Sequence, residues 1–369
     1  MDNEIIVPFF SFQSAPKGIR KEWLAQIIKV IDSGVFVNGF HKKSFEEKWS
    51  STINAGYSIG VGNGLDGLVL ALKTLKIGIG CKVAVPAHTF IATWNAVEIV
   101  GATPIGIDVD PNGLMDLEML EKLNVEIDAV IPVHMHGKMV DMERLCNWAT
   151  RKSVKIIEDA SQSHLARQGE KYAGTWGAIG VFSLYPTKNL GALGDSGVIV
   201  TNSLELKKRL ETLSNYGSSQ EDKYRHLEIG INSRLDEIQA ACLLVNLENL
   251  PIYTDRRNEI AKKYLTFVKN NRIRFLNSTI EQSNVWHHFP IISTYRDSLK
   301  KYLAIKGIGT EIHYPFAAGS EFLQIKGSVK SDFPRADQLS SEILSLPNHP
   351  WLSNKQIDYV VGTLNSFEA

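Results

Sequence analysis

The sequence offers little that would indicate a metal site, a membrane span or a nucleic-acid partner. Its three cysteines, Cys81, Cys146 and Cys242, lie far apart and form no CxxC pair, so neither a disulfide framework nor a zinc site is indicated. No run approaches the ~20 apolar residues of a membrane span, and no basic segment precedes the short apolar N-terminal stretch, as it would in a secretory signal. Lys+Arg and Asp+Glu both number 40, which leaves no excess positive charge for nucleic acid or an anionic membrane. We expect a soluble cytoplasmic protein without a metal.

The 369 residues suffice for about two domains. Helical patterns alternate with short apolar runs from about residue 65 to residue 200; the runs include KVAVPA, TPIGIDVD, VKIIEDA, GAIGVFSLY and GVIVTN. Continuous apolarity predicts strands that are buried on both faces of a largely parallel sheet in an α/β fold. The C-terminal stretch mixes short strands with helices, among them a helix predicted over SSEILSL, residues 340–346. We predict a large domain over residues 12–250 and a smaller α+β domain over residues 251–369.

One lysine lies on a glycine-flanked turn, and one acidic residue follows a buried strand. Lys188 stands in GAIGVFSLYPTKNLGALGDSG, and Asp159 closes the run VKIIED. Such a pair suits pyridoxal phosphate, because the acid can face the pyridine nitrogen while the amine forms a Schiff base. Taken alone, each residue also has an ordinary interpretation: Asp159 as a helix cap and Lys188 as a solvated side chain. Together they indicate an enzyme with this cofactor.

A glycine-rich helix start supplies a candidate phosphate site. The segment VGNGLDGLVLAL follows a short apolar run, and the first amides of a helix bind anions. Gly62, Gly64 and Gly67 also fit the dinucleotide fingerprint G-x-G-x-x-G, but no acidic residue follows about 20 positions later. A phosphate carried by a cofactor other than NAD therefore fits this turn better, and an ordinary glycine turn is the alternative.

Several aromatic residues and histidines have two interpretations. Phe90 and Trp94 lie at helical spacing, which is more typical of core residues than of residues that stack on a cofactor. His134 and His136 are two residues apart on an extended segment, so their rings should point to opposite faces and share no metal. The adjacent pairs His287-His288 and His313-Tyr314 either contact a sugar or simply pack.

The ordered motifs resemble the DegT/DnrJ/EryC1/StrS family of sugar aminotransferases over nearly the whole chain. The motifs that carry the resemblance are DSGVFVNG, GNGLDGLVLAL, PAHTFIATWNAV, GATPIGIDVD, IEDASQSH, FSLYPTKNLGALGDSG, GINSRLDEIQAA and GIGTEIHYP. The resemblance implies the aspartate aminotransferase fold (fold type I). It also implies a large, mostly parallel seven-stranded sheet domain, a smaller C-terminal domain, pyridoxal phosphate and a homodimer.

The resemblance places the reactive end of the cofactor around Lys188. Lys188 would form the Schiff base and move protons between the substrate carbon and the cofactor. Asp159 would pair with the ring nitrogen and Gln162 with the side of the ring hydroxyl. Phe90 stands where family members stack an aromatic side chain on the ring.

The same resemblance assigns the phosphate and the substrate to other segments. The groups that would hold the phosphate are Gly64, the amides of Leu65 and Asp66, and Ser183. Asn232 matches an asparagine that reaches the phosphate from the other subunit, and Leu65 stands where many relatives carry a hydroxyl residue. The positions that would meet the nucleotide sugar are Tyr185, His313 and Tyr314.

The implied reaction transfers the amino group of L-glutamate to a nucleoside-diphosphate keto-sugar, with pyridoxamine phosphate as the intermediate form. GNGLDGL and YPTKNLGALGD are most like the subgroup that acts at C3 of a TDP-linked 3-keto-6-deoxyhexose. Its products are amino sugars of the Fuc3N or Qui3N type for O-antigen, lipopolysaccharide or other glycoconjugates. Action at C4 of a TDP-4-keto-6-deoxyhexose is the first alternative, and an NAD-dependent nucleotide-sugar oxidoreductase is the more remote one. Lys188 favours transamination over dehydration, because dehydratases of the family carry His there.

Overall fold

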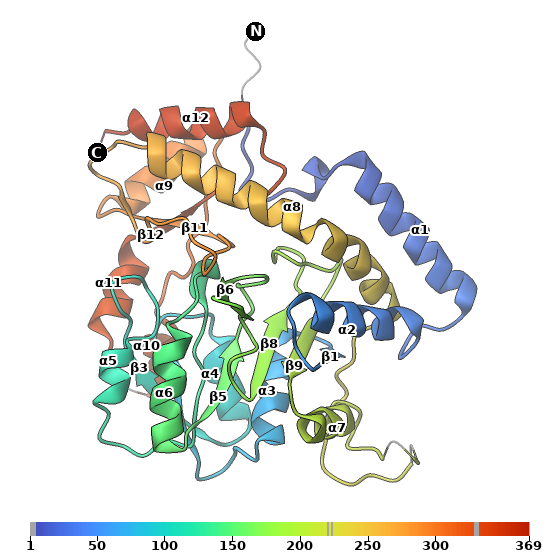
Figure 1. Cartoon of the computed structure of the whole chain (residues 1–369). Coiled ribbons are helices and arrows are strands. Elements are labelled where there is room, and N and C mark those ends of the chain that lie inside the picture. Colours follow the sequence, from blue (N-terminus) through green and yellow to red (C-terminus); the bar gives the residue numbers. More distant parts are fainter. Residues whose placement is uncertain (1–4, 220, 223, 328–331, 369) are drawn as a thin grey trace.

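A seven-stranded sheet forms the centre of the computed structural model, which describes residues 5–219, 221–222, 224–327 and 332–368 (Figure 1). The strand order is β1-β9-β8-β5-β4-β2-β3. The strands are β1 (Tyr57–Val61), β2 (Lys82–Pro86), β3 (Thr103–Ile107), β4 (Ala129–Val130), β5 (Lys155–Asp159), β8 (Ile179–Ser183) and β9 (Gly197–Thr201). Only β9 runs antiparallel to its neighbours β1 and β8, and the remaining pairs are parallel. The prediction of a mostly parallel sheet in an α/β fold is confirmed.

Helices cover both faces of this sheet. Along β2, Val83 and Val85 join one buried apolar cluster, while Ala84 joins the cluster on the opposite face. The helices on the first face are α3 (Gly64–Thr74), α4 (Ala92–Ile99) and α7 (Leu204–Leu213). Those on the other face are α2 (Phe40–Thr52), α6 (Met142–Lys152) and the first half of α8 (Glu237–Phe267). Burial on both faces explains why the strands are continuously apolar rather than alternating.

A second, smaller sheet has a core of its own. Its strands are β10 (Arg274–Phe275), β11 (Phe289–Ile292) and β12 (Ile343–Leu346), paired antiparallel. The helices around it are α9 (Arg296–Ile305), α12 (Asn354–Asn365) and the second half of α8. Helix α8 thus contributes Leu250 to the core of the large sheet and Ile260 to that of the small one. It runs unbroken past Pro251, so the domain boundary predicted there falls inside a helix and stays a prediction.

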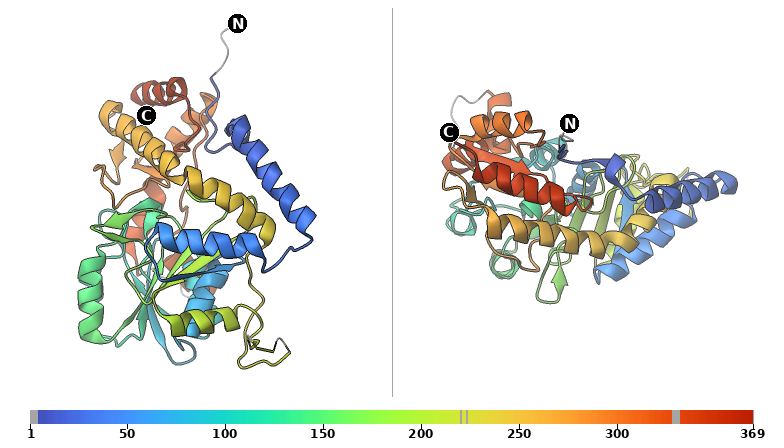
Figure 2. Two further views of the ribbon diagram at one scale, coloured as in Figure 1. Left: turned by 45° about the vertical axis from the view of Figure 1, so that its right-hand side comes forward. Right: turned by 90° about the horizontal axis from the view of Figure 1, so that it is seen from above.

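Two outlying regions complete the fold. Helix α1 (Lys17–Ser33) packs along α8 at one side of the molecule, as both views of Figure 2 show. Helices α10 (Ala318–Ile325) and α11 (Pro334–Glu342) return from the C-terminal stretch to the large sheet. There Phe322 and Phe333 pack on Trp94 of α4. Short elements fill the remaining connections: α5 (Leu117–Glu121), β6 (Arg167–Gln168) and β7 (Lys171–Tyr172).

The prediction of a helix over residues 340–346 is wrong in its second half. Helix α11 ends at Glu342, and Ile343–Leu346 form strand β12 between β11 and a backbone bridge to Glu311. Leu344 and Leu346 enter the small core, while Ser345 between them does not. Buried apolar side chains thus recur at every second residue, which is the pattern of a strand, and β11 offers a free edge with which this strand pairs. No helix in the described ranges is long and apolar enough to cross a membrane.

Candidate active site

A cavity of about 670 Å³ lies at the carboxyl ends of β5 and β8, where sheets of this class bind ligands. We call it the main cavity. It brings together most of the predicted site residues: Gly64, Leu65, Phe90, Asp159, Gln162, Ser183, Tyr185, Lys188, His313 and Tyr314. Two predicted residues, Asp66 and Asn232, are not among those that line it. Residues far apart in the sequence therefore converge on one site.

Asp159 is the best-fixed acid of the main cavity. It ends β5 and is only 6% exposed. Its Oδ2 accepts a hydrogen bond of 3.0 Å from the Thr93 hydroxyl, and its Oδ1 accepts one of 3.2 Å from the Ser161 amide. These two donors fix the orientation of the carboxylate, and hydrogen bonds of this kind favour its ionised form. Thr93 was not predicted as a site residue. The one feature of the sequence that could have indicated it is a hydroxyl side chain among the buried residues of α4.

Lys188 lines the same cavity from the turn after β8. The turn is closed by the Lys188 amide, which donates to the Tyr185 carbonyl at 2.8 Å. Burial lowers the pKa of the Lys188 amine to about 8, and the negative charge of Asp159 opposes this shift. An amine with such a pKa is partly neutral near physiological pH, which nucleophilic attack on a carbonyl requires. Lys188 thus has the partly neutral amine, and Asp159 the hydrogen-bonded carboxylate, that pyridoxal phosphate chemistry requires.

Gln162 and two aromatic rings form the wall beside Asp159. Gln162 is 3% exposed; its Oε1 accepts from the His136 amide at 2.7 Å, and its Nε2 donates to the Tyr314 hydroxyl at 3.3 Å. The ring of Phe90 lies 5.5 Å from that of Tyr314, centroid to centroid. Phe90 is 54% exposed, so it belongs to the cavity rim and not to the core. A flat aromatic ligand therefore has both a stacking partner and an amide partner here.

The start of α3 lines another part of the main cavity. The first two helical amides, of Gly64 and Leu65, have no acceptor within the helix, whereas the Asp66 amide donates to the Asn63 side chain at 2.8 Å. A Cβ on Gly197 would lie 2.7 Å from the Asn63 carbonyl carbon and 3.1 Å from the Gly64 nitrogen. Glycine at that position lets β9 approach the turn. Ser183, at the end of β8, lies beside Gly64, so Ser183 and the two residues that carry these amides line the same part of the cavity.

Histidines form the wall on the side of the small domain. His287, His288 and His313 line the main cavity, and His136 lies behind His288 with a 3.4 Å contact between their Nδ1 atoms. Burial lowers the pKa of His313 to about 4 and that of His288 well below its ordinary value, so these rings are neutral at pH 7. His134 instead contacts Glu158 at 3.1 Å. The prediction of an extended segment is wrong here, because Met135–Gly137 form a short 3₁₀ turn.

The dinucleotide interpretation of Gly62, Gly64 and Gly67 is wrong. A Rossmann fingerprint joins two adjacent parallel strands, but β1 pairs with β9 alone and does so antiparallel. The amides at the start of α3 can still bind a phosphate. The adjacent parallel strand that would bind the rest of a dinucleotide is replaced by the antiparallel strand β9.

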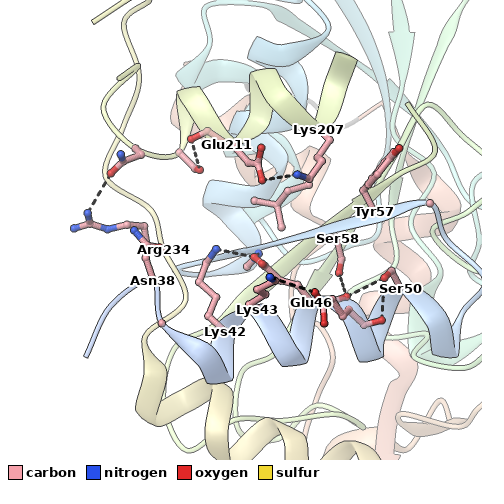
Figure 3. Close-up of a pocket in the computed structure, with 17 residues that line it drawn as sticks. Asn38, Lys42, Lys43, Glu46, Ser50, Tyr57, Ser58, Lys207, Glu211 and Arg234 are labelled. Carbon is pink, nitrogen blue, oxygen red and sulfur yellow. Dashed lines mark hydrogen bonds and ion pairs between the residues drawn. The ribbon is translucent and has the colours of Figure 1, made fainter. Parts of the chain in front are cut away.

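A second hollow of about 580 Å³ lies between α2, β1 and α7, and its charged groups are largely paired within it (Figure 3). Lys42 contacts Glu46 at 2.7 Å and Lys207 contacts Glu211 at 2.9 Å. Burial raises the pKa of Glu46 despite Lys42. This arrangement offers neither the isolated amine nor the hydroxyl-bound acid of the main cavity, so the main cavity is the candidate active site.

Known proteins similar to this chain show its family. The sequence model of the DegT/DnrJ/EryC1/StrS aminotransferase family matches residues 17–365. The dTDP-3-amino-3,4,6-trideoxy-alpha-D-glucose transaminase of Streptomyces venezuelae is 37% identical over 98% of this chain and 96% of its own length. The dTDP-3-amino-3,6-dideoxy-alpha-D-galactopyranose transaminase of Aneurinibacillus thermoaerophilus is 38% identical over 98% of this chain and 99% of its own length.

The crystal structure of DesV from S. venezuelae with a ketimine intermediate superposes with a TM-score of 0.93, at 37% identity and 98% coverage of both chains. The family match and this fold confirm the predicted resemblance, including the enzyme class and the cofactor, pyridoxal phosphate with pyridoxamine phosphate as its other form. The chain belongs to the DegT/DnrJ/EryC1/StrS aminotransferase family and is a nucleotide-sugar aminotransferase.

Proposed function

We propose that this aminotransferase moves the amino group of L-glutamate to C3 of a TDP-linked 3-keto-6-deoxyhexose. The observation that supports C3 is that both relatives named above are transaminases of dTDP-linked 3-amino sugars. The motifs GNGLDGL and YPTKNLGALGD favour the same subgroup. The family also includes enzymes that act at C4 and on UDP- and GDP-linked sugars, so C4 is the competing outcome.

The residues of the main cavity fit pyridoxal phosphate, since an amine, a hydrogen-bonded acid and two helix-start amides face one space. When bound, the cofactor draws electrons from the substrate carbon. In our proposal the Lys188 amine would hold the cofactor by its aldehyde carbon until the amino group of the substrate displaces it, and the released amine would then move a proton at the substrate carbon. The Asp159 carboxylate, held by Thr93 and by the Ser161 amide, keeps the ring nitrogen protonated.

The other assignments follow the family resemblance, and their residues line the main cavity. Gln162 would meet the ring hydroxyl and Phe90 would cover one face of the ring. The amides of Gly64 and Leu65 and the Ser183 hydroxyl bind the phosphate, aided by the dipole of α3. On the open side, the residues that meet the sugar are Tyr185, His313 and Tyr314.

We further propose that the enzyme is a homodimer whose second subunit completes the phosphate site. Asn232 is exposed and lies outside the main cavity of its own chain, as a residue that serves the partner's cavity would. On α1, Leu24, Ile28 and Ile31 are 61%, 55% and 55% exposed at helical spacing. An apolar stripe of this kind is typical of an interface, and α1 is therefore a candidate contact region.

The proposed regiochemistry is tested with ¹⁵N-labelled L-glutamate and separate TDP-3-keto- and TDP-4-keto-6-deoxyhexoses. We expect label at C3 of the product, located by its ¹⁵N–¹³C coupling, and no product from the 4-keto sugar. Label at C4 would reject the C3 proposal while leaving transamination intact. No labelled sugar from either substrate would reject TDP-ketosugars as the substrate class.

A further inference from the structure

Ser345 is a polar residue inside an apolar strand, in contact with a histidine of the main cavity. It is 0% exposed and lies between Leu344 and Leu346, whose side chains enter the small core. Because side chains alternate along a strand, Ser345 points to the other face. Its Oγ lies 3.0 Å from Nδ1 of His313.

The bonding of this pair determines which ring nitrogen of His313 carries the proton. Among the described residues, Ser345 Oγ has no other hydrogen-bond partner. A buried hydroxyl that accepted from Nδ1–H would leave its own proton without an acceptor, which is costly. The favoured arrangement is the one in which Ser345 donates to Nδ1. The neutral ring of His313 then carries its proton on Nε2.

The surroundings hold the His313 ring in one orientation. The ring of His288 stacks on it at 3.8 Å between centroids with 13° between planes, and Phe9 lies 5.6 Å away on another side. The backbones of Glu311 and Ser345 exchange two hydrogen bonds, of 3.3 and 2.7 Å, which fixes the segment that carries His313. His313 itself is only partly buried and lines the main cavity.

We propose that Ser345 is a positioning residue that holds His313 as a neutral Nε2–H donor, which selects an acceptor oxygen on the nucleotide-sugar substrate. The identity of the substrate rests on the proposed function; the tautomer does not. A ring fixed in this way favours a carbonyl or hydroxyl oxygen at that point of the sugar. It disfavours a substrate that presents only a hydrogen-bond donor there.

The tautomer is tested without substrate by ¹⁵N NMR of histidine-labelled holoenzyme at pH 7, with His313→Gln used to assign the signals. We expect His313 to show a protonated Nε2 and an unprotonated Nδ1 that accepts a hydrogen bond. In Ser345→Ala we expect the Nδ1 signal to move toward that of a free acceptor. A protonated Nδ1 in the native enzyme, or signals unchanged by Ser345→Ala, would overturn the proposal.

The consequence for recognition is tested by measuring the two half-reactions separately. We expect Ser345→Ala to lower kcat/KM for the ketosugar about 3- to 10-fold, as the loss of one hydrogen bond implies, and to leave the half-reaction with L-glutamate within about twofold. The matched control is Ser340→Ala, a serine that is 3% exposed and whose hydroxyl has no hydrogen-bond partner within the described part of the chain. It should change neither half-reaction.

An equal loss in both half-reactions of Ser345→Ala, or an equal loss in the control, would contradict a role in sugar recognition. If the native enzyme aminates no TDP-ketosugar at all, the proposed function fails, while the NMR result still decides the tautomer.

Discussion

In our proposal the main cavity has a ring end, at Asp159 and Gln162, and a phosphate end, at the start of α3. The two ends differ in how their binding groups are held. At the ring end, Asp159 and Gln162 are 6% and 3% exposed and each makes two hydrogen bonds to groups of the same chain. At the phosphate end, the Gly64 and Leu65 amides open on the cavity. Among the described lining residues Lys188 is the one Lys or Arg side chain, so in our proposal this chain would bind the phosphate with helix amides and a hydroxyl.

This difference suggests that the residues needed for catalysis and the residues needed to bind the cofactor phosphate are separate sets. In our proposal, one chain supplies and orients the acid and the amine that the reaction needs. The binding of the phosphate would depend on a helix start and on Asn232 of a second subunit. Changes at the ring end should therefore reduce catalysis, whereas changes at the phosphate end should mainly weaken cofactor binding.

Lys188→Ala should have the largest effect. We expect turnover to fall by about 10⁴-fold, the upper end for removal of a positioned acid–base group, because the covalent anchor is lost as well. Steady-state assays at saturating cofactor measure it. The control is Lys152→Ala at the exposed end of α6, which should keep native turnover. A Lys188→Ala enzyme within tenfold of native would refute the assignment.

Asp159→Asn should come next. The amide cannot supply the negative charge that the ring nitrogen needs, so we expect kcat to fall about 10²- to 10³-fold, as when a preorganised electrostatic partner is removed. Asp195→Asn, an exposed acid in the same cavity, should lose less than tenfold in kcat. Equal losses in the two variants would mean that the cavity needs negative charge in general and not Asp159 in particular.

Asn232→Ala tests the phosphate end. Loss of a hydrogen bond to a charged group should weaken binding of pyridoxal phosphate about 10- to 100-fold, while kcat at saturating cofactor stays near native. Fluorescence titration of the apoenzyme gives the affinity. Asn124→Ala, an exposed asparagine on the large domain, is the control. A fall in kcat without a change in affinity would place Asn232 at the ring end instead.

The pH dependence of cofactor attachment has the smallest expected effect. Since the pKa of the Lys188 amine is lowered to about 8, its neutral fraction rises about tenfold per pH unit below that value and then levels off. The rate at which the apoenzyme combines with pyridoxal phosphate should follow this curve, once corrected for ionisation of the cofactor phosphate. A rate that keeps rising toward pH 10 would indicate a lysine with an ordinary pKa.

The sequence predicted the parts of the site that lie on consecutive buried strands. Asp159 ends β5 and Lys188 lies on the turn after β8, and adjacent parallel strands end at the same edge of a sheet. Continuous apolar strands likewise predicted a sheet covered on both faces.

Contacts that depend on distant packing were not predictable. Thr93 lies 66 residues from Asp159 in the sequence, and nothing in its local sequence indicates that contact. Residues 343–346 were predicted as helix because their local pattern does not reveal the edge of β11, which makes them a strand and places Ser345 against His313. Asp66 was predicted to face the phosphate, but the Asn63 side chain takes its amide.

The most direct test of Lys188 as the residue that binds the cofactor covalently is chemical trapping of the lysine. Borohydride reduction of the holoenzyme, followed by peptide mapping with mass spectrometry, identifies the residue that carries the cofactor. The account predicts a single pyridoxyl label on Lys188, and its loss in Lys188→Ala. A label on another lysine, or no label on a chain that binds the cofactor, would contradict it.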